Sequence, residues 1–428
     1  MAYRGWLQFG TTELANAERA VTYLENGACS TSVEVFHDDS WPDTHTFLGQ
    51  SPYTTPAQDG APWFSPSIPE SADFFGIWPM QIDGLDSTAL NREVLESAGE
   101  GAVFGIPHAQ ARHIKIEALL LAGTPEAAEF GLQWLNAVLR GDACEPFDTP
   151  RDLQFLDVTP PISVTDTDAQ VIARAQRHQR KLYNVACTEQ VEVKQRFGQY
   201  LPERRQTTCF KVEFTLTAGN PFIWKYTTSL ADPVVLANGQ TTTVSFERTV
   251  NGVCPSACPP DAPPLYDPNL PAPVPLPRPL TPASAVGCQP IQSKRTKVTI
   301  PSGKVRQFEQ VVPTVVIATG AQAERNIRLQ WVRGNDTDDL QCASIGEVMI
   351  GYIPANSFMT LDGVTGQATC QTGSGKPVDA TPVVSGRLGG PWRAPVLRCG
   401  SDHTIVLDAA TSVSPTVQAV ITGQVRAA

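Results

Sequence analysis

The alternating stretch Phe210-Lys-Val-Glu-Phe-Thr-Leu216 carries the strongest structural signal in the chain. Its four apolar residues are separated by single polar residues, which is the period of a β-strand with one face against a core. Residues 183–194 can supply a partner strand, with a polar turn at Leu201–Arg205 between the two. The stretch therefore predicts a half-buried antiparallel sheet in this part of the chain.

Helical patterns precede this strand. Thr124 can cap a helix, Pro125 suits its first position and Gly141 can end it. Between them, apolar residues recur at spacings of four, three and four: Ala128, Leu132, Leu135 and Leu139. A strand is expected at 114–121, and further helices at 13–26 and at 166–179, the latter capped by Thr165 or Asp166. The N-terminal part is thus expected to be α+β.

Proline is concentrated in one segment. Residues 254–290 hold 13 of the 37 prolines. Proline fixes φ and lacks the backbone donor, so the segment favours extended polyproline II. We expect a semi-rigid linker that separates a first domain, residues 1–253, from a second, residues 291–428. A docking site for a proline-binding module is the alternative reading.

The C-terminal part is predicted to be all β. Ile327, Leu329 and Trp331 alternate with polar residues, and Val417, Ala419, Ile421 and Val425 favour one face of a late strand. Asp362-Gly363 is a tight-turn signal. Gly and Pro recur between these runs, as in a β-sandwich. The fold class expected for the whole chain is mainly β.

Composition excludes several classes of protein. The 428 residues carry a net charge of −11, which argues against a non-specific nucleic-acid binder. No apolar run approaches the roughly 20 residues that span a bilayer. The N-terminus has no apolar signal segment, so synthesis without export is expected. The ten cysteines are expected to be mostly reduced, buried thiols.

Two short motifs imitate catalytic sites. Residues 373–376 look like the end of a phosphate-binding loop, but Cys370 replaces its first glycine and Pro377 its Ser/Thr. Ser401-Asp402-His403 has the residue types of a catalytic triad. Adjacent strand residues point to opposite faces, so these three cannot form one. We therefore assign no catalytic or cofactor-binding residue and expect no enzyme.

Three clusters have ligand types that suit metals. The first cluster consists of His37, Asp38, Asp39, Asp43 and His45. It is the best metal candidate, although a solvated loop that carries Asp and His is the commoner interpretation. The second is Asn335–Asp339, where Leu340 and a missing glycine break the calcium-loop spacing. The third is Cys254, Cys258 and Cys288, for which free thiols, a disulfide or zinc remain open. No metal is assigned.

Ten stretches form an ordered set along the chain: Trp6–Gly10, Leu14–Arg19, Tyr23, Gly123–Leu135, Gly141–Cys144, Arg180–Ala186, Phe214–Phe222, the Cys/Pro segment, Leu361–Gly366 and Pro395–Ile405. In this order they resemble minor tail and distal tail proteins of long-tailed actinobacteriophages. The long N-terminal region and the proline-rich segment depart from the better-known distal tail proteins.

The resemblance implies a structural virion protein at the tail tip, assembled in the host cytoplasm. It implies a ring, usually of six copies, that joins the tail tube to the tip, with tail tube, tape-measure and tip or baseplate proteins as partners. The C-terminal domain would be a galectin-like β-sandwich facing outward.

Two other functions remain open. One is a tail module that binds a host surface glycan, for which Trp331, Tyr352 and Trp392 can stack on sugar rings, although each also fits a core or interface. The other is a wall-opening tail hydrolase, for which no acid/base or nucleophile arrangement is recognisable.

Overall fold

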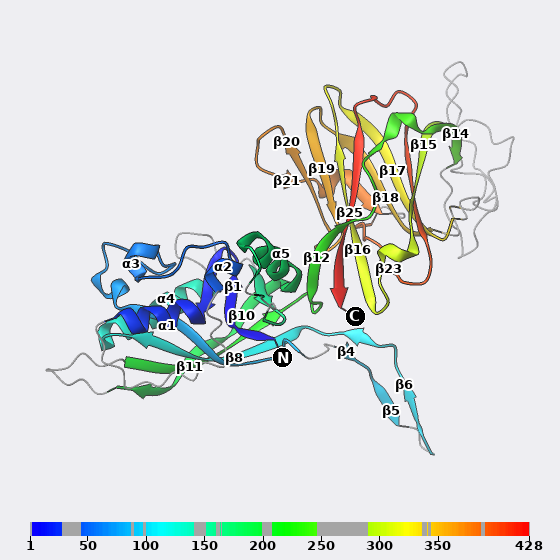
Figure 1. The fold of residues 1–428 in the computed structure, drawn as a ribbon. Coiled ribbons are helices and arrows are strands. Elements are labelled where there is room, and N and C mark those ends of the chain that lie inside the picture. The colour runs from blue at the N-terminus through cyan, green and yellow to red at the C-terminus, as the bar shows by residue number, and fades with distance from the viewer. Residues whose placement is uncertain are drawn as a thin grey trace, which may run out of the picture. The chain divides into compact units, whose positions relative to one another are not determined.

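The computed structural model describes residues 2–27, 44–86, 90–96, 100–140, 151–159, 163, 165–198, 208–245, 290–335, 340, 344–386 and 390–427. The chain forms two compact units, Met1–Tyr226 and Thr227–Ala428. The fold is mainly β, as the sequence predicts (Figure 1). No helix among the described residues is long and apolar enough to cross a membrane.

The first unit is built on an antiparallel sheet in the order β2-β1-β9-β10-β11-β8-β3. Its strands are β1 (Tyr3–Phe9), β2 (Thr12–Asn16), β3 (Phe74–Asp83), β8 (Arg112–Ala122), β9 (Arg151–Leu156), β10 (Gln179–Phe197) and β11 (Thr208–Ala218). Its shorter strands are β4 (Leu90–Asn91), β5 (Val94–Glu96), β6 (Ala102–Phe104) and β7 (His108–Ala109). Its helices are α1 (Ala17–Asn26), α2 (Thr44–Phe47), α3 (Pro56–Asp59), η1 (Pro69–Ala72), α4 (Pro125–Arg140) and α5 (Asp168–His178).

The predicted strand at 210–216 is β11, and it lies between β10 and β8 in the sheet. Phe214 and Leu216 are 1% and 0% exposed, because this face packs into the main core of the unit. The expected pairing with residues 183–194 is confirmed within β10. The strand at 114–121 is likewise confirmed as part of β8.

The helix predicted over 125–140 is confirmed as α4, with Ala128, Leu135 and Leu139 buried. The predicted helix at 13–26 was wrong in its first turn, because residues 12–16 pair with β1 as strand β2. Asn16 is extended, and its side chain accepts a hydrogen bond from the backbone nitrogen of Arg19 at 3.1 Å, which starts α1 there. The third helix, α5, is capped at Thr167 and not at Thr165 or Asp166.

The second unit contains two antiparallel sheets, consistent with the expected sandwich. One runs β14-β15-β24-β17-β18-β22, and the other runs β25-β16-β19-β20-β21 with β13 and β23 at its sides. Trp331 and Ile405 of the first sheet and Ile317 and Ile421 of the second are all 0% exposed.

The strands of this unit include β12 (Trp224–Ser229), which begins at the end of the first unit, β13 (Val234–Val235), β14 (Gln240–Ser245), β15 (Pro290–Ile300), β16 (Glu309–Ala318), β17 (Glu324–Arg333) and β18 (Ser344–Ile353). They continue with β19 (Ser357–Asp362), β20 (Gln367–Thr372), β21 (Val378–Asp379), β22 (Val384–Gly386), β23 (Leu397–Arg398), β24 (His403–Ala410) and β25 (Gln418–Ala427). Short 3-10 turns are η2 (Leu236–Asn238), η4 (Ser302–Lys304) and η5 (Thr381–Val383).

The division between the two units differs from the expected boundaries at 253 and 291. Strand β13 pairs with β25, and β14 pairs with β15, so residues 234–245 lie with the C-terminal strands. The register brings Ser245 opposite Pro290. The proline-rich segment lies outside the described residues apart from Pro290, but the strands on either side of it are neighbours within one unit. The sequence had predicted a spacer between two domains.

Candidate functional site

Strands β5 and β6 form a hairpin that extends away from the sheet of the first unit (Figure 1). Its apolar side chains are exposed. Val94 and Leu95 are 53% and 57% exposed, and Val103 and Phe104 are 65% and 61% exposed. Ile106, just beyond β6, is 88% exposed. A gathering of exposed apolar side chains of this kind marks an interaction surface.

The pairing register makes both faces of the hairpin apolar. Val94 lies opposite Phe104 and Leu95 lies opposite Val103. Directly opposed residues point to the same side and neighbours along a strand point to opposite sides. Each face therefore carries one apolar pair. A lone two-stranded hairpin is marginally stable in water, and among the described residues neither face of this hairpin has a covering layer.

Our sequence interpretation missed this hairpin, although a signal is present. Two short apolar runs, Val94-Leu95 and Val103-Phe104, stand on either side of the glycine-containing segment Gly99-Glu100-Gly101. This arrangement is typical of a hairpin with a short loop. The runs are too short to show a period, so the pattern gives no information on whether they are buried.

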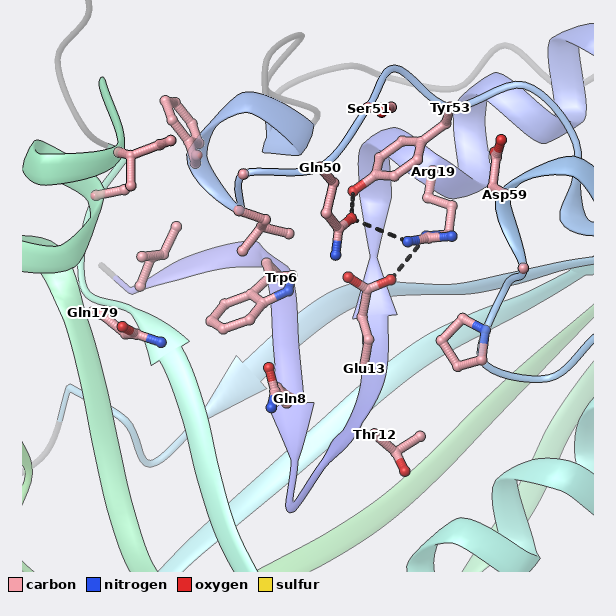
Figure 2. A pocket seen from close by; sticks show the side chains of 18 of the residues that line it. Trp6, Gln8, Thr12, Glu13, Arg19, Gln50, Ser51, Tyr53, Asp59 and Gln179 are labelled. Atoms are coloured by element: carbon pink, nitrogen blue, oxygen red, sulfur yellow. Dashed lines mark hydrogen bonds and ion pairs between the residues drawn. The ribbon is translucent and has the colours of Figure 1, made fainter. Parts of the chain in front are cut away.

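A groove of about 1060 Å³ is the second candidate site in the first unit. Trp6 and Gln8 of β1 and Glu13 of β2 lie on its floor, on the side of β1 opposite the core residues Leu7 and Phe9 (Figure 2). Helix α5 contributes Ile172, Ala175 and Gln176, and the segment 47–62 contributes most of the remaining lining. The groove therefore depends on elements far apart in the sequence.

An ion pair with its hydrogen bonds organises one end of the groove (Figure 2). The Arg19 Nε lies 2.9 Å from Glu13 Oε1, and Arg19 Nη2 donates to Gln50 Oε1 at 3.1 Å. The Tyr53 hydroxyl also donates to Gln50 Oε1, at 2.6 Å, and accepts from Asn16 Nδ2 at 2.8 Å. The side chains of Glu13 and Arg19 are 9% and 6% exposed, so the pair is largely removed from water.

Electrostatics fix the protonation of this network. Burial opposes the charge of Arg19, but the Glu13 carboxylate together with Tyr23 and Tyr53 outweighs this effect and raises the pKa of the guanidinium. Burial, followed by the charge of Glu13, raises the pKa of the Tyr53 hydroxyl. Arg19 therefore stays charged and Tyr53 stays protonated near neutral pH. Asp59 is held by Thr54, whose backbone nitrogen and hydroxyl each donate to it at 2.7 Å.

The predicted metal candidates are not brought together within the described residues. His37, Asp38, Asp39 and Asp43 lie outside them, and His45 Nδ1 lies 2.7 Å from Glu18 Oε1. Cys254, Cys258, Cys288 and residues 336–339 also lie outside the described part. In the part of the chain that the structure describes, no group of three or more His, Cys, Asp or Glu side chains could hold a metal.

The two imitations of catalytic motifs have structural roles. Asp402 Oδ1 accepts from the backbone nitrogen of Ser302 at 2.8 Å, and burial lowers the pKa of His403, whose side chain is enclosed. Residues 373–376 form the turn between β20 and β21.

Of the aromatic side chains considered for sugar stacking, Trp331 is 0% and Trp392 4% exposed. Tyr352 is partly exposed, with the Arg325 guanidinium 5.1 Å from its ring centroid.

Comparison with known proteins gives no family assignment. No protein-family model matches the chain, and no curated protein matches it. The Dit (gp 19.1) protein of phage SPP1, from the hub adsorption apparatus of Gram-positive-infecting phages, is similar with a TM-score of 0.40 and 10% identity over 83% of this chain and 94% of that one. The baseplate of phage p2 in its activated conformation is similar with a TM-score of 0.33 and 9% identity, over 79% of this chain and 92% of the other. Likeness at these TM-scores does not establish the fold or the function of this chain.

Proposed function

We propose that the protein is a structural component of a phage tail, a distal or minor tail protein that forms a ring between the tail tube and the tail tip. The proposal is supported by the ordered resemblance of its sequence to actinobacteriophage tail proteins and by the hairpin of β5 and β6. It acts by holding sister copies and neighbouring tail proteins together, and it is not an enzyme.

The single observation that carries the proposal is the hairpin with two exposed apolar faces. Burying a side chain such as Val, Leu or Phe contributes about 1.5–3 kcal/mol. Association costs an estimated 4–15 kcal/mol for lost translational and rotational freedom. Burial of the apolar side chains of one hairpin nearly balances this cost. In a closed ring each subunit uses its hairpin once and receives a neighbour's hairpin once. Closure therefore makes a contact of this size sufficient.

In this proposal the first unit builds the ring, with six copies as the expected number, and the β-sandwich unit decorates it. The partners are the tail tube, tape-measure and tip or baseplate proteins. The site of action is the virion, after assembly in the host cytoplasm.

The test compares the oligomeric state of the full chain with that of two matched variants. Phe104→Glu places a charge on the hairpin, whereas Phe358→Glu makes the same change at a side chain of the second unit that is 48% exposed. Light scattering and electron microscopy at micromolar concentration should show closed rings for the unaltered chain and for Phe358→Glu. Phe104→Glu should be monomeric. An unaltered chain that stays monomeric, or rings that survive Phe104→Glu, would contradict the proposal.

A further inference from the structure

We infer that the groove of the first unit is a binding site for a neutral, hydroxyl-rich chain, an oligosaccharide of several rings. This site is separate from the aromatic side chains of the second unit. The inference goes beyond ring assembly and does not depend on it.

The floor of the groove contains a buried donor without an acceptor. Trp6 is 2% exposed, and its indole Nε1 has no hydrogen-bond partner among the described residues. Figure 2 shows this nitrogen on the side of the ring turned toward Glu13. Buried polar groups are almost always paired. The indole nitrogen of Trp331 is orphaned as well, but Trp6 lines a groove that a ligand can enter, so a ligand can supply its missing partner. An indole N–H can only donate, and the missing partner must therefore offer an acceptor.

Three amide side chains line the same groove as Trp6. Gln8 Nε2 donates to the Gly10 carbonyl at 3.1 Å, and Gln179 Nε2 donates to Gln154 Oε1 at 2.7 Å. Gln50 uses its oxygen for Arg19 and Tyr53. Each of these three amides makes its hydrogen bonds through one end and keeps the other end free among the described residues. The groove thus presents both donors and acceptors, which hydroxyl groups match because each hydroxyl can do both.

Charge argues against an anionic ligand. The Glu13 carboxylate and the Arg19 guanidinium neutralise each other, and Asp59 is held by Thr54. Among the described residues, the groove lining provides no second cation that could bind an anionic group. An anionic ligand would therefore lose its hydration here without gaining an opposite charge.

The exposed part of the lining argues against a peptide anchored by apolar side chains. Of the apolar lining residues, Trp6, Phe47, Tyr53 and Leu156 are buried, Leu48 and Ile172 are half-buried and Pro62 is exposed. The exposed lining is otherwise mostly polar and includes Gln50, Ser51, Gln58 and Gln176. Pockets that hold small molecules span about 300–1,000 Å³, and this groove reaches about 1060 Å³. Its size suits a chain of several sugar rings held by hydrogen bonds.

The test measures binding to the full chain by titration calorimetry. The neutral probes are maltohexaose, cellohexaose and mannohexaose. Hexagalacturonate serves as the anionic comparison, and a synthetic peptide with the sequence of residues 268–280 provides acceptors without side-chain hydroxyl groups. At least one neutral hexasaccharide should bind at millimolar concentration or below, and the other two probes should not.

Three variants locate the binding. Trp6→Phe removes the orphaned N–H and Gln8→Leu removes one amide, and each should weaken binding about tenfold, the loss of one hydrogen bond. Trp331→Phe makes the same change as Trp6→Phe at a buried, unpartnered indole of the second unit and should leave binding unchanged. If Trp6→Phe does not fold, Gln8→Leu decides the question.

Three outcomes would overturn the inference: no neutral hexasaccharide binds, binding is unchanged in Gln8→Leu, or the peptide or hexagalacturonate binds in preference. Light scattering on the same samples reports ring assembly. Failure of binding and failure of the proposed structural function are therefore read separately.

Discussion

The strand pairs β8–β11 and β5–β6 belong to the same unit and use the same kind of residues, but they differ in what surrounds them. β8 and β11 pair without a bulge from Arg112↔Ala218 to Ala122↔Thr208, and β3 and β10 flank them. Their apolar residues are buried in the main core. β5 and β6 share three pairs, and their apolar side chains are exposed. Apolar residues in a strand therefore stabilise the monomer only where a second layer covers them, and elsewhere they provide an interface.

The largest difference between the β8–β11 pair and the β5–β6 hairpin is expected in the reactivity of a cysteine thiol. Burial raises the pKa of Cys209, in β11, from 9.0 to about 12. At pH 8 its thiolate population is then about a thousandfold smaller than that of an ordinary thiol. In a Leu95→Cys variant, dilute monomer should react with iodoacetamide at the hairpin while Cys209 stays unmodified. Peptide mass spectrometry checks this, and equal labelling of both positions would show that the two regions are not different.

Among the substitutions that test stability, a cavity in the core against β8 and β11 should lower the free energy of unfolding the most. Phe214 is 1% exposed within the core. Phe214→Ala should lower the free energy of unfolding of the first unit by about 3–5 kcal/mol, because it removes buried area and leaves a cavity. Urea denaturation followed by tryptophan fluorescence measures the change. A loss below 1 kcal/mol, on the order of a surface substitution, would mean that this core is not packed as described.

Close packing against the same sheet gives an intermediate effect. A Cβ added to Gly131 of α4 would lie 2.2 Å from Phe74 Cε2, and Phe74 is 0% exposed. Alanine gains about 1 kcal/mol of helix propensity over glycine, but overpacking costs about 1–3 kcal/mol. We expect Gly131→Ala to destabilise the first unit, measured by the same denaturation.

Gln133→Ala, at an exposed position of the same helix, is the control for Gly131→Ala. This substitution should be neutral or slightly stabilising, because Gln133 is exposed and not part of the core, and alanine has the higher helix propensity. A stabilised Gly131→Ala variant would show that Phe74 moves aside freely.

The smallest effect is expected in the hairpin itself. Leu95→Ala should change the unfolding free energy of dilute monomer by less than about 0.5 kcal/mol, because the side chain is 57% exposed. Its association should weaken at the same time. If Leu95→Ala destabilises the monomer as strongly as Phe214→Ala, a covering layer within the chain exists and the hairpin is not an interface.

Elements in which the apolar pattern repeats over several periods were predictable from the sequence. The alternation at 210–216 and the apolar repeat of 125–140 identify β11 and α4, because local periodicity reflects one-sided burial. The start of α1 was not predictable, because pairing of residues 12–16 with β1 overrides a helical pattern. Neither candidate site was predicted. The hairpin runs are too short to show a period, and the groove has no local signal.

By itself, the sequence determined the mainly β class, the strongest strand and helix, and the resemblance to phage tail proteins, since these depend on residues close together in the chain. Only the tertiary structure decided that Trp331 and Trp392 are enclosed, that the strands flanking the proline-rich segment are neighbours, and that Trp6, Gln50 and Gln179 share one groove. Those facts depend on contacts between segments tens to hundreds of residues apart. Local propensity does not specify such contacts, because they are selected by the packing of the whole unit.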